Sequence, residues 1–374
     1  MDTKQLLSFF PALALVAGTS LSTQVVADAP ALEPGHEYMV VANYPNTLHV
    51  IDLQSDKLYK TCALPDDFGP GATQMAPDGK TAYILNNHYE DVYGIDLDTC
   101  NVTFHAAMSL QANERTKSIF SFAISPDGKE LYTVQNPTLM LPDHYRVQPS
   151  RLAVYDTGDG LDARPVRTFP APRQVTVMQT GDDGTLYMAG ADIYKVDVKT
   201  GERDVAIPSR NWKRPLYAAP DVLDVWPIQS PSRDFTILYT TAKFKDETQN
   251  LDTADWLYGF MNINLKTGET RTEDFGPLTE IYFSGIVSPK DNNIVYGVLN
   301  RLAKYDVRKK ELVAAAELDH SYYCIAMNHA GTKIYLAGTF NDVAIYDADS
   351  MKKLGHVQLP GGDMAISTSQ VFIR

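Results

Sequence analysis

The residue types that most often carry enzyme chemistry are present in this chain, but their spacing matches no known catalytic set. None of the eight histidines forms an HExxH pair, and no two of them have the spacing of paired metal ligands. The sequence has no CxxCH haem-attachment motif and no GxSxG, P-loop or dinucleotide-binding fingerprint. We therefore predict no catalytic residue, no metal site and no covalently bound cofactor in this chain.

The three cysteines allow one disulfide and leave at least one thiol. Cys324 lies inside an apolar run, which is typical of a small core residue. Cys62 and Cys100 fall near the ends of two consecutive repeats, and an oxidising compartment would permit a bond between them. Nothing in the sequence fixes their geometry, so the pairing stays open at this point.

Aromatic side chains gather at the start of several short apolar runs, where they could form a hydrophobic wall facing a ligand or a partner. Two polar residues near similar run starts could orient a ligand or satisfy backbone groups of a loop. The candidate positions for a pocket or partner-facing surface are Phe120, Phe122, Gln174, Asp221, Trp226, Tyr282, Phe283, Tyr322 and Tyr323. The alternative interpretation of the aromatic residues is packing between repeated units.

The elements that position these residues are repeats of about forty residues. Residues 321–360 contain four short runs rich in Val, Ile, Tyr and Ala, separated by turn formers, which is the pattern of four antiparallel strands. Similar units precede it, and each third run ends in an Asp or Asn. These seven positions are Asp52, Asp96, Asp156, Asp197, Asn264, Asp306 and Asp347. Four of the six steps between them measure 41 to 44 residues, the period of propeller blades.

We therefore predict an all-β fold, a seven-bladed β-propeller of four-stranded antiparallel blades. The repeated Asp and Asn side chains are expected to cap turns and to have a structural role. The first blade lacks an innermost strand, and residues 364–367 (MAIS) are expected to supply it, so that C-terminal and N-terminal strands pair and close the ring. Residues 137–150 and 242–256 are insertions, which could be functional loops or surface decoration.

The first 27 residues resemble a secretory signal, with a basic start at Lys4, an apolar segment and small residues before Ala27. We expect cleavage there, followed by a single propeller domain over residues 28–374 in the bacterial periplasm. The net charge of −13 and pI of about 5.0 disfavour nucleic acid as a partner. No later stretch of the sequence is long and apolar enough for a membrane span.

Several segments of the chain resemble the β subunit of quinohemoprotein amine dehydrogenase. They are RVQPSRLAVYD, FPAPRQVTVM, AAPDVLDVW, IYFSG, HSYYCIAMN and LPGGDMAIS. The resemblance covers the chain from about Tyr38 to Arg374, and single blades also resemble YVTN-type propellers. Propeller packing alone does not require phrases such as PAPRQ or HSYY.

The resemblance implies a periplasmic heterotrimer that oxidises primary amines to aldehyde and ammonia. In that family a dihaem cytochrome c α subunit and a small γ subunit with cysteine tryptophylquinone accompany the propeller. The propeller binds both chains and helps to wall the active-site pocket, and electrons pass through the haems to a soluble acceptor protein. Because the quinone and the catalytic base belong to the γ subunit, no catalytic residue carries over to this sequence.

Three alternatives remain on the sequence alone. A stand-alone, lactonase-like propeller enzyme would need metal ligands or acid–base residues at the mouth of its channel. An exported YVTN-type propeller would act as a binding or scaffold protein without a redox partner. The heavy chain of methylamine dehydrogenase would pair with a different quinone subunit.

Overall fold

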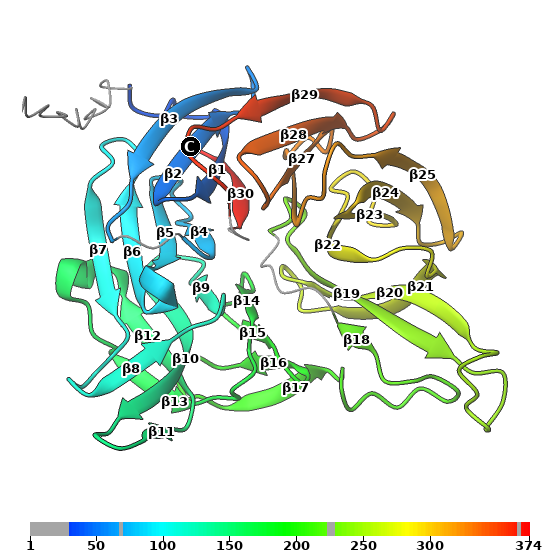
Figure 1. The fold of residues 1–374 in the computed structure, drawn as a ribbon, viewed down its shortest axis with the longest axis horizontal. Helices are drawn as coiled ribbons and strands as arrows, with labels where there is room; N and C mark the ends of the chain where they lie inside the picture. Colours follow the sequence, from blue (N-terminus) through cyan, green and yellow to red (C-terminus); the bar gives the residue numbers. More distant parts are fainter. Residues whose placement is uncertain (1–29, 67–69, 223–228, 365–367) are drawn as a thin grey trace, which may run out of the picture.

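The computed structural model describes residues 30–66, 70–222, 229–364 and 368–374. Within these residues the strands form seven separate sheets arranged in a ring (Figure 1). Each sheet contributes four antiparallel strands to a blade, and the third sheet carries two additional strands. The predicted seven-bladed β-propeller of four-stranded blades is therefore confirmed.

The blades follow the chain, and in each the strands are given from the ring centre outward. Blade 1 contains β30 (Ser369–Ile373), β1 (Glu37–Asn43), β2 (Thr47–Asp52) and β3 (Lys57–Ala63). Blade 2 contains β4 (Thr73–Met75), β5 (Thr81–Asn86), β6 (Asp91–Asp96) and β7 (Val102–Ala107). Blade 3 contains β9 (Phe122–Ile124), β10 (Glu130–Met140), β12 (Arg151–Asp156) and β13 (Arg167–Pro170). Blades 4 and 5 contain β14 (Val177–Thr180), β15 (Leu186–Ala189), β16 (Ile193–Val196) and β17 (Arg203–Ile207); and β18 (Asp221–Val222), β19 (Asp234–Lys243), β20 (Asp255–Asn264) and β21 (Thr270–Pro277). Blades 6 and 7 contain β22 (Tyr282–Val287), β23 (Ile294–Leu299), β24 (Arg301–Asp306) and β25 (Glu311–Glu317); and β26 (Cys324–Met327), β27 (Lys333–Ala337), β28 (Asp342–Asp347) and β29 (Lys353–Gln358).

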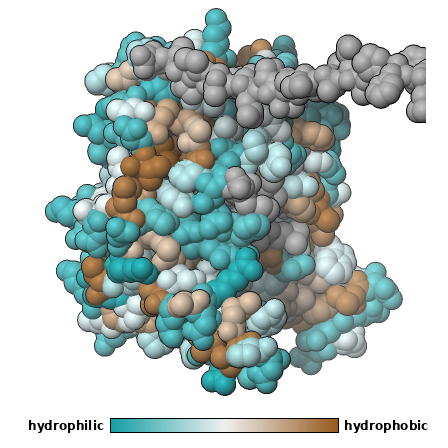
Figure 2. Space-filling model, turned by 60° about the vertical axis from the view of Figure 1, so that its left-hand side comes forward, coloured by the Kyte–Doolittle hydropathy of each residue, from teal (hydrophilic) through white to brown (hydrophobic). Residues whose placement is uncertain are grey.

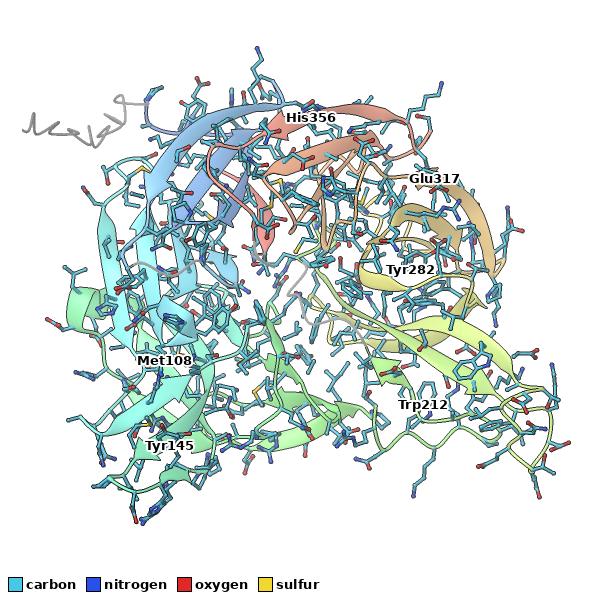
Figure 3. The ribbon with its side chains drawn as sticks, in the orientation of Figure 1. Met108, Tyr145, Trp212, Tyr282, Glu317 and His356 are labelled. Carbon is cyan, nitrogen blue, oxygen red and sulfur yellow. A yellow bond between two sulfur atoms is a disulfide. The ribbon has the colours of Figure 1, made fainter. Side chains whose placement is uncertain are left out.

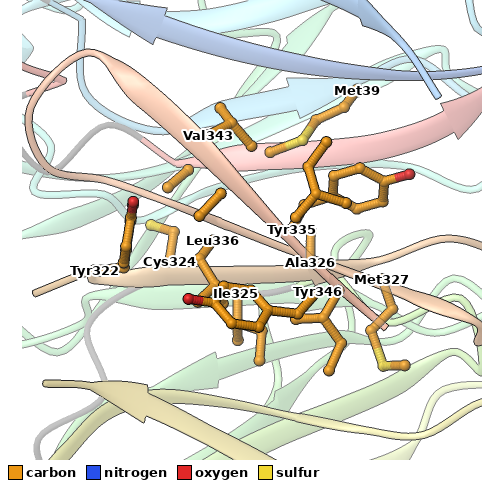
Figure 4. Packing of buried hydrophobic residues seen from close by; sticks show 14 of the residues in the cluster. Met39, Tyr322, Cys324, Ile325, Ala326, Met327, Tyr335, Leu336, Val343 and Tyr346 are labelled. Carbon is orange, nitrogen blue, oxygen red and sulfur yellow. The ribbon is translucent and has the colours of Figure 1, made fainter. Parts of the chain in front are cut away.

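The burial of each strand follows its place in the blade. Middle strands such as β27 and β28 are almost continuously buried, because both of their faces pack against neighbouring blades. Outer strands such as β25 are largely exposed or half-buried. In blade 7 the core includes Cys324, Tyr335 and Tyr346, and Met39 of blade 1 reaches into the same cluster (Figure 4). The apolar repeats thus form cores that are shared between adjacent blades, and the predicted core position of Cys324 is confirmed.

The ring closes by pairing of C-terminal and N-terminal strands, as predicted, but through a different segment. β30 pairs antiparallel with β1, with Met39 opposite Val371 and Tyr38 opposite Phe372. The expected closing segment, residues 364–367, does not form this strand. Met364 is buried and its backbone N–H donates to the carbonyl of Phe340, while residues 365–367 lie outside the described residues. The Ser369–Ile373 strand places Phe372 against Tyr38, with ring centroids 5.9 Å apart.

Both predicted insertions lengthen strands and carry an irregular loop beyond them, over residues 141–144 in the first and 244–254 in the second. β10 continues past its blade and pairs on either side with β8 (Glu114–Lys117) and β11 (Tyr145–Val147). β19 and β20 form a ten-residue pairing that ends at Lys243 and Asp255. Two short 3-10 helices, η1 (Asn87–Tyr89) and η2 (Thr157–Asp162), lie in connections of blades 2 and 3.

Cys62 and Cys100 form a disulfide, with their Cα atoms 5.2 Å apart. The bond joins the outer strand of blade 1 to the turn before β7 of blade 2. Lys60 donates from its ammonium to the carbonyls of Leu97 and Asp98 in the same turn, and Arg374 pairs with the Asp98 carboxylate at 2.6 Å. The closing blade is therefore fastened to blade 2 by a covalent bond and by charged groups.

The expected signal segment, residues 1–27, lies outside the described residues. Among the residues that are described, no helix has the length and apolar character needed to cross a bilayer.

Candidate functional site

The alternating direction of the strands gives the propeller two different faces. The connections from the second to the third strand of a blade, and from one blade to the next, emerge on one side, which we call the loop face. The connections from first to second and from third to fourth strand emerge on the opposite side, which we call the turn face. The loop face carries the long connections, including β8, β11, the β19–β20 extension and residues 208–220.

The turn face is built from hydrogen bonds within each turn. All seven anchor side chains at the ends of the third strands accept a backbone N–H two or three residues later, at 2.7 to 3.0 Å. Hydrogen bonds from the Ser350 hydroxyl and backbone lower the pKa of Asp347 below its ordinary value. These carboxylates are engaged with their own backbone, which confirms the structural role predicted for them.

Exposed apolar side chains are concentrated on the loop face. Of the eighteen large hydrophobic residues that are exposed in the described parts of the chain, eleven belong to loop-face connections or strand extensions. The eleven are Tyr44, Leu110, Ile119, Met140, Tyr145, Val147, Leu216, Leu251, Trp256, Ile281 and Phe340. On the flank shown in Figure 2, by contrast, hydrophobic residues form separate clusters among hydrophilic ones. This bias distinguishes the loop face from the turn face.

Four of the predicted aromatic candidates are packing residues. Phe120 and Phe122 are buried between blades 2 and 3, and the Phe120 ring lies 5.5 Å from Tyr89. Tyr282 is buried, and its hydroxyl bonds to Tyr305 and Glu280 within 3.0 Å. Figure 3 shows Tyr282 against the sheet of blade 6, whereas Tyr145 lies at the outer edge of blade 3.

Tyr322 is the fourth buried aromatic candidate, and it belongs to a polar cluster. Its hydroxyl donates to the Asp342 carboxylate at 2.6 Å, and burial raises its pKa so that the proton is retained. The His320 ring lies tilted against Tyr322, with centroids 4.1 Å apart, and bonds through Nε2 to the other Asp342 oxygen at 2.8 Å. The His320 ring also meets Phe340 edge-on at 4.5 Å. Asp342 therefore fixes two rings directly beneath an exposed aromatic side chain.

The remaining candidates are more accessible but do not come together. Phe283 and Tyr323 are half-buried and contact each other at 5.0 Å across blades 6 and 7. Gln174 is exposed in the connection between blades 3 and 4, and Asp221 is exposed at the first position of β18 in blade 5. Trp226 lies outside the described residues. The structure thus spreads the predicted positions around the loop face rather than forming one pocket.

A second loop-face cluster, which the sequence did not suggest, fixes residues 208–220. The Arg214 guanidinium binds both oxygens of Asp274, at 2.9 and 2.7 Å. Burial alone would raise the pKa of Asp274, but hydrogen bonds from Arg214 and two tyrosines lower it. Arg214 also lies over the Tyr217 ring at 3.8 Å. Only the fold reveals this cluster, because Arg214 and Asp274 are sixty residues apart.

Two of the cavities lined by described residues lie toward the turn face. One, of about 410 Å³, lies on the ring axis and is lined by Gln74, Gln179, Gln229 and Gln370. Gln74 accepts hydrogen bonds from Gln229 of blade 5 and from Gln370 of blade 1, so side-chain amides link opposite sides of the channel. The other is an open groove of about 850 Å³ between blades 3 and 4. Within the described residues, no group of three His, Cys, Asp or Glu side chains could hold a metal ion.

The comparisons with known proteins reveal the fold. No protein-family model matches the chain, and no curated protein sequence does so either. Hydrazine synthase from Kuenenia stuttgartiensis matches with a TM-score of 0.52 and 16% identity, covering 92% of this chain and 99% of that one. Apo AztD from Citrobacter koseri matches with a TM-score of 0.54 and 12% identity over 90% and 98% of the two chains.

A third match is dihydro-haem d1 dehydrogenase NirN, with a TM-score of 0.53 and 14% identity over 91% of this chain and 76% of that one. These proteins differ in what their names say they do, and their identities to this chain are low. They share the architecture only. The chain is therefore shown to be a seven-bladed β-propeller, one whose structural neighbours include enzymes or enzyme subunits.

Proposed function

We propose that this chain is the β subunit of a periplasmic quinohemoprotein amine dehydrogenase. In this role it binds a dihaem cytochrome c chain and a small chain that carries cysteine tryptophylquinone. It helps to wall the pocket in which a primary amine is oxidised to an aldehyde, and it contributes no catalytic group. Oxidation of the amine and transfer of electrons through haem c to a soluble acceptor belong to the partner chains.

The observation that carries this proposal is where the family-like segments lie. Their distinctive parts are residues 146–150, 170–174, 218–222, 281–285, 320–323 and 359–363. Every one of them is in a loop-face connection or at the first residues of an inner strand that starts from that face. Blade packing explains the repeated strands and turns, but it does not require particular phrases at these six connections. Their collection on a single face supports recognition of a partner there.

The chemistry of the loop face supports a protein partner. Its exposed side chains include Tyr145 and Trp256 on the two extended hairpins, and tyrosine and tryptophan are enriched at protein interfaces. Arg214 and Asp274 hold one long connection, and Arg151 and Glu114 hold β8 through a bond of 2.7 Å between largely buried side chains. Rigid loops limit the conformational entropy that docking would cost.

Co-expression tests this proposal. The chain would be produced alone and together with the proteins encoded by its genomic neighbours, and each preparation would be assayed for dye reduction by n-butylamine. We expect the three chains to co-purify and only the complex to oxidise the amine. Activity of the isolated propeller, or failure of the three chains to co-purify, would contradict the proposal.

A second candidate is an exported propeller that binds a small polar ligand or acts as a scaffold without redox partners. The axial cavity of about 410 Å³, lined by four glutamines, favours this candidate because amides can both donate and accept hydrogen bonds. The same co-expression experiment separates the two, since this candidate predicts no stable complex with a haem-bearing chain.

A further inference from the structure

The axial cavity contains a chain of side-chain amides whose orientation is fixed. Gln370 of β30 accepts the backbone N–H of Met75 at 2.7 Å, which distinguishes its carbonyl oxygen from its amide nitrogen. Its Nε2 donates to Gln74 Oε1 at 3.2 Å, and Gln74 Nε2 donates to the carbonyl of Phe122, also at 3.2 Å. Gln229 Nε2 donates to the same oxygen of Gln74. Two backbone groups therefore set the direction of three amides.

This orientation leaves each of the three amides with an N–H group to offer. An amide nitrogen carries two hydrogens, and among the described residues each of Gln74, Gln229 and Gln370 uses one of them. Both acceptor positions of Gln74 Oε1 are occupied by the other two amides. All three side chains line the cavity, and Gln74 and Gln370 are only 1% exposed. The cavity therefore presents mainly donors, which suit a ligand that carries oxygen acceptors.

The charged groups that line the same cavity are already paired. The Arg233 guanidinium donates twice to Asp182, at 3.0 and 2.7 Å, and His329 Nδ1 lies 2.6 Å from the Glu37 carboxylate. A charged ligand would lose its hydration without gaining an unpaired opposite charge among the described lining residues. Apolar lining side chains such as Ile124 can contact the carbon atoms of an uncharged ligand. The lining therefore favours a neutral molecule.

The size of the cavity suits a small molecule rather than a single water. Its volume of about 410 Å³ lies at the lower end of the range of ligand pockets, whereas one water has a share of about 30 Å³ in the liquid. Ligand hydroxyl groups can displace waters when they reproduce the hydrogen bonds of those waters. The turn residues Pro77, Pro126 and His329 belong to the lining, so a ligand reaches the cavity from the turn face.

We propose that the axial cavity binds a small uncharged polyhydroxylated molecule, a monosaccharide or a cyclic polyol, through the N–H groups of Gln74, Gln229 and Gln370. The hydroxyl oxygens of the ligand accept these N–H groups. A ligand hydroxyl can also donate to Gln229 Oε1, for which the described residues supply no donor. The site lies on the face opposite the family-like connections. It rests on the second candidate function and names the ligand class for it.

The test measures binding to the isolated full chain by titration calorimetry. D-glucose and myo-inositol are the neutral probes, and sodium succinate is the charged comparator. Gln229→Leu removes the amide of the half-buried member of the chain of amides, and Gln229→Glu keeps its size but removes its N–H donors. Gln54→Leu is the matched control, because Gln54 is exposed in the turn between β2 and β3 and does not line the cavity. Melting temperatures establish that each variant is folded.

We expect a neutral probe to bind the wild-type chain with a Kd of about 1 mM or lower, and succinate not to bind. Both Gln229 variants should weaken binding of the neutral probe about tenfold, the effect of losing one or two hydrogen bonds. Gln54→Leu should weaken it by less than about twofold. Equal affinity of the wild-type chain and both Gln229 variants would place the bound probe outside the axial cavity and overturn the proposal.

The comparator separates the ligand class from the function on which it rests. Binding of succinate alone would refute an uncharged ligand, while the second candidate function would stand. If none of the three probes binds, the cavity holds water only, which refutes both the axial ligand and the second candidate function. Co-purification with a haem-bearing chain would still decide the amine dehydrogenase proposal independently.

Discussion

The two faces of this propeller hold the connections between their strands in different ways. On the turn face, an Asp or Asn closes each third strand by binding the backbone of its own turn. On the loop face, connections are held by residues from distant parts of the chain, as Asp363 holds Tyr44 and Phe340. Hydrogen bonds within a turn can repeat from blade to blade because they need only local residues. Contacts with distant residues differ from one loop-face connection to the next.

We expect this difference to separate residues that stabilise the fold from residues that bind a partner. The turn face repeats because each turn satisfies itself, and it exposes few large apolar side chains. The loop face exposes most of them and also carries the family-like segments. If the comparison holds, substitutions at turn-face junctions should change the stability of the chain. Substitutions of exposed loop-face residues should leave stability unchanged and weaken assembly.

The largest effect on stability is expected at the junction of blades 1 and 2. The Cys62–Cys100 bond closes a sequence separation of 38 residues, for which the chain-entropy account gives about 4 kcal/mol. We expect Cys62→Ser/Cys100→Ser to lose roughly this amount in urea unfolding, and reduction of the wild-type protein to lower its melting temperature. Cys324→Ser in the wild-type background tests whether the effect belongs to the disulfide. Equal stability of wild type and the double variant would show that the disulfide does not stabilise the junction of blades 1 and 2.

A large pH-dependent effect is expected beneath the loop face. Burial lowers the pKa of His49 to about 4, and its ring bonds to Asn43, which holds residues 360 and 362. His49 in the unfolded chain has a pKa near 6.5. Between pH 4 and pH 6.5 the unfolded chain therefore binds a proton at His49 that the folded chain does not bind. Stability from neutral His49 should be complete above pH 6.5 and decline by about 3 kcal/mol as the pH falls to 4. His49→Gln should flatten that part of the pH–stability curve, and an unchanged slope would refute the assignment.

A smaller effect is expected at a single turn-face anchor. Asp347→Ala should lose about 1 kcal/mol at pH 7, the net value of a hydrogen bond, whereas Asp347→Asn should be nearly neutral because Asn264 does the same work in blade 5. The folded-state pKa of Asp347 is lowered, so its charge-dependent contribution is present above the unfolded pKa and lost as the pH falls through the folded pKa. The stability difference between wild type and Asp347→Ala should therefore shrink below about pH 4. Denaturant titrations at pH 7 and pH 3 measure both differences.

The smallest effect on stability is expected at exposed loop-face residues. Tyr145 is 71% exposed and Trp256 is 46% exposed, so replacing either with alanine should change the free energy of unfolding by less than about 0.5 kcal/mol. The same variants should lower recovery of partner chains on co-purification. A loss of stability comparable to that at the Cys62–Cys100 junction would show that the two faces do not divide these roles.

The sequence predicted the repeating parts of this molecule well, because their causes are local. Asp78-Gly79 and Asp127-Gly128 mark tight turns, and both glycines have positive φ. The anchors from Asp52 to Asp347 gave the blade count without any long-range information. For the aromatic candidates the sequence left packing and a partner-facing surface open, and the structure buries Phe122 and Tyr322. Their burial depends on which blade packs against them.

The same limit applied to ring closure. Residues 364–367 matched the pattern of an inner strand, but β30 begins at Ser369. The choice is made by pairing with β1 more than 300 residues away, where Phe372 meets Tyr38. The sequence also could not predict that Asp363 contacts both Tyr44 and Phe340, because these two residues become neighbours of one segment only after the ring closes.

The sequence by itself determined the blade period, the turn chemistry and the core positions of the strands, including that of Cys324. These follow from the spacing of apolar residues, glycines and Asp or Asn side chains within about forty residues. The tertiary structure alone decided which strand closes the ring, that Cys62 and Cys100 pair, and which aromatic side chains face solvent. Those outcomes depend on contacts between residues far apart in the chain, which neither periodicity nor local propensity encodes.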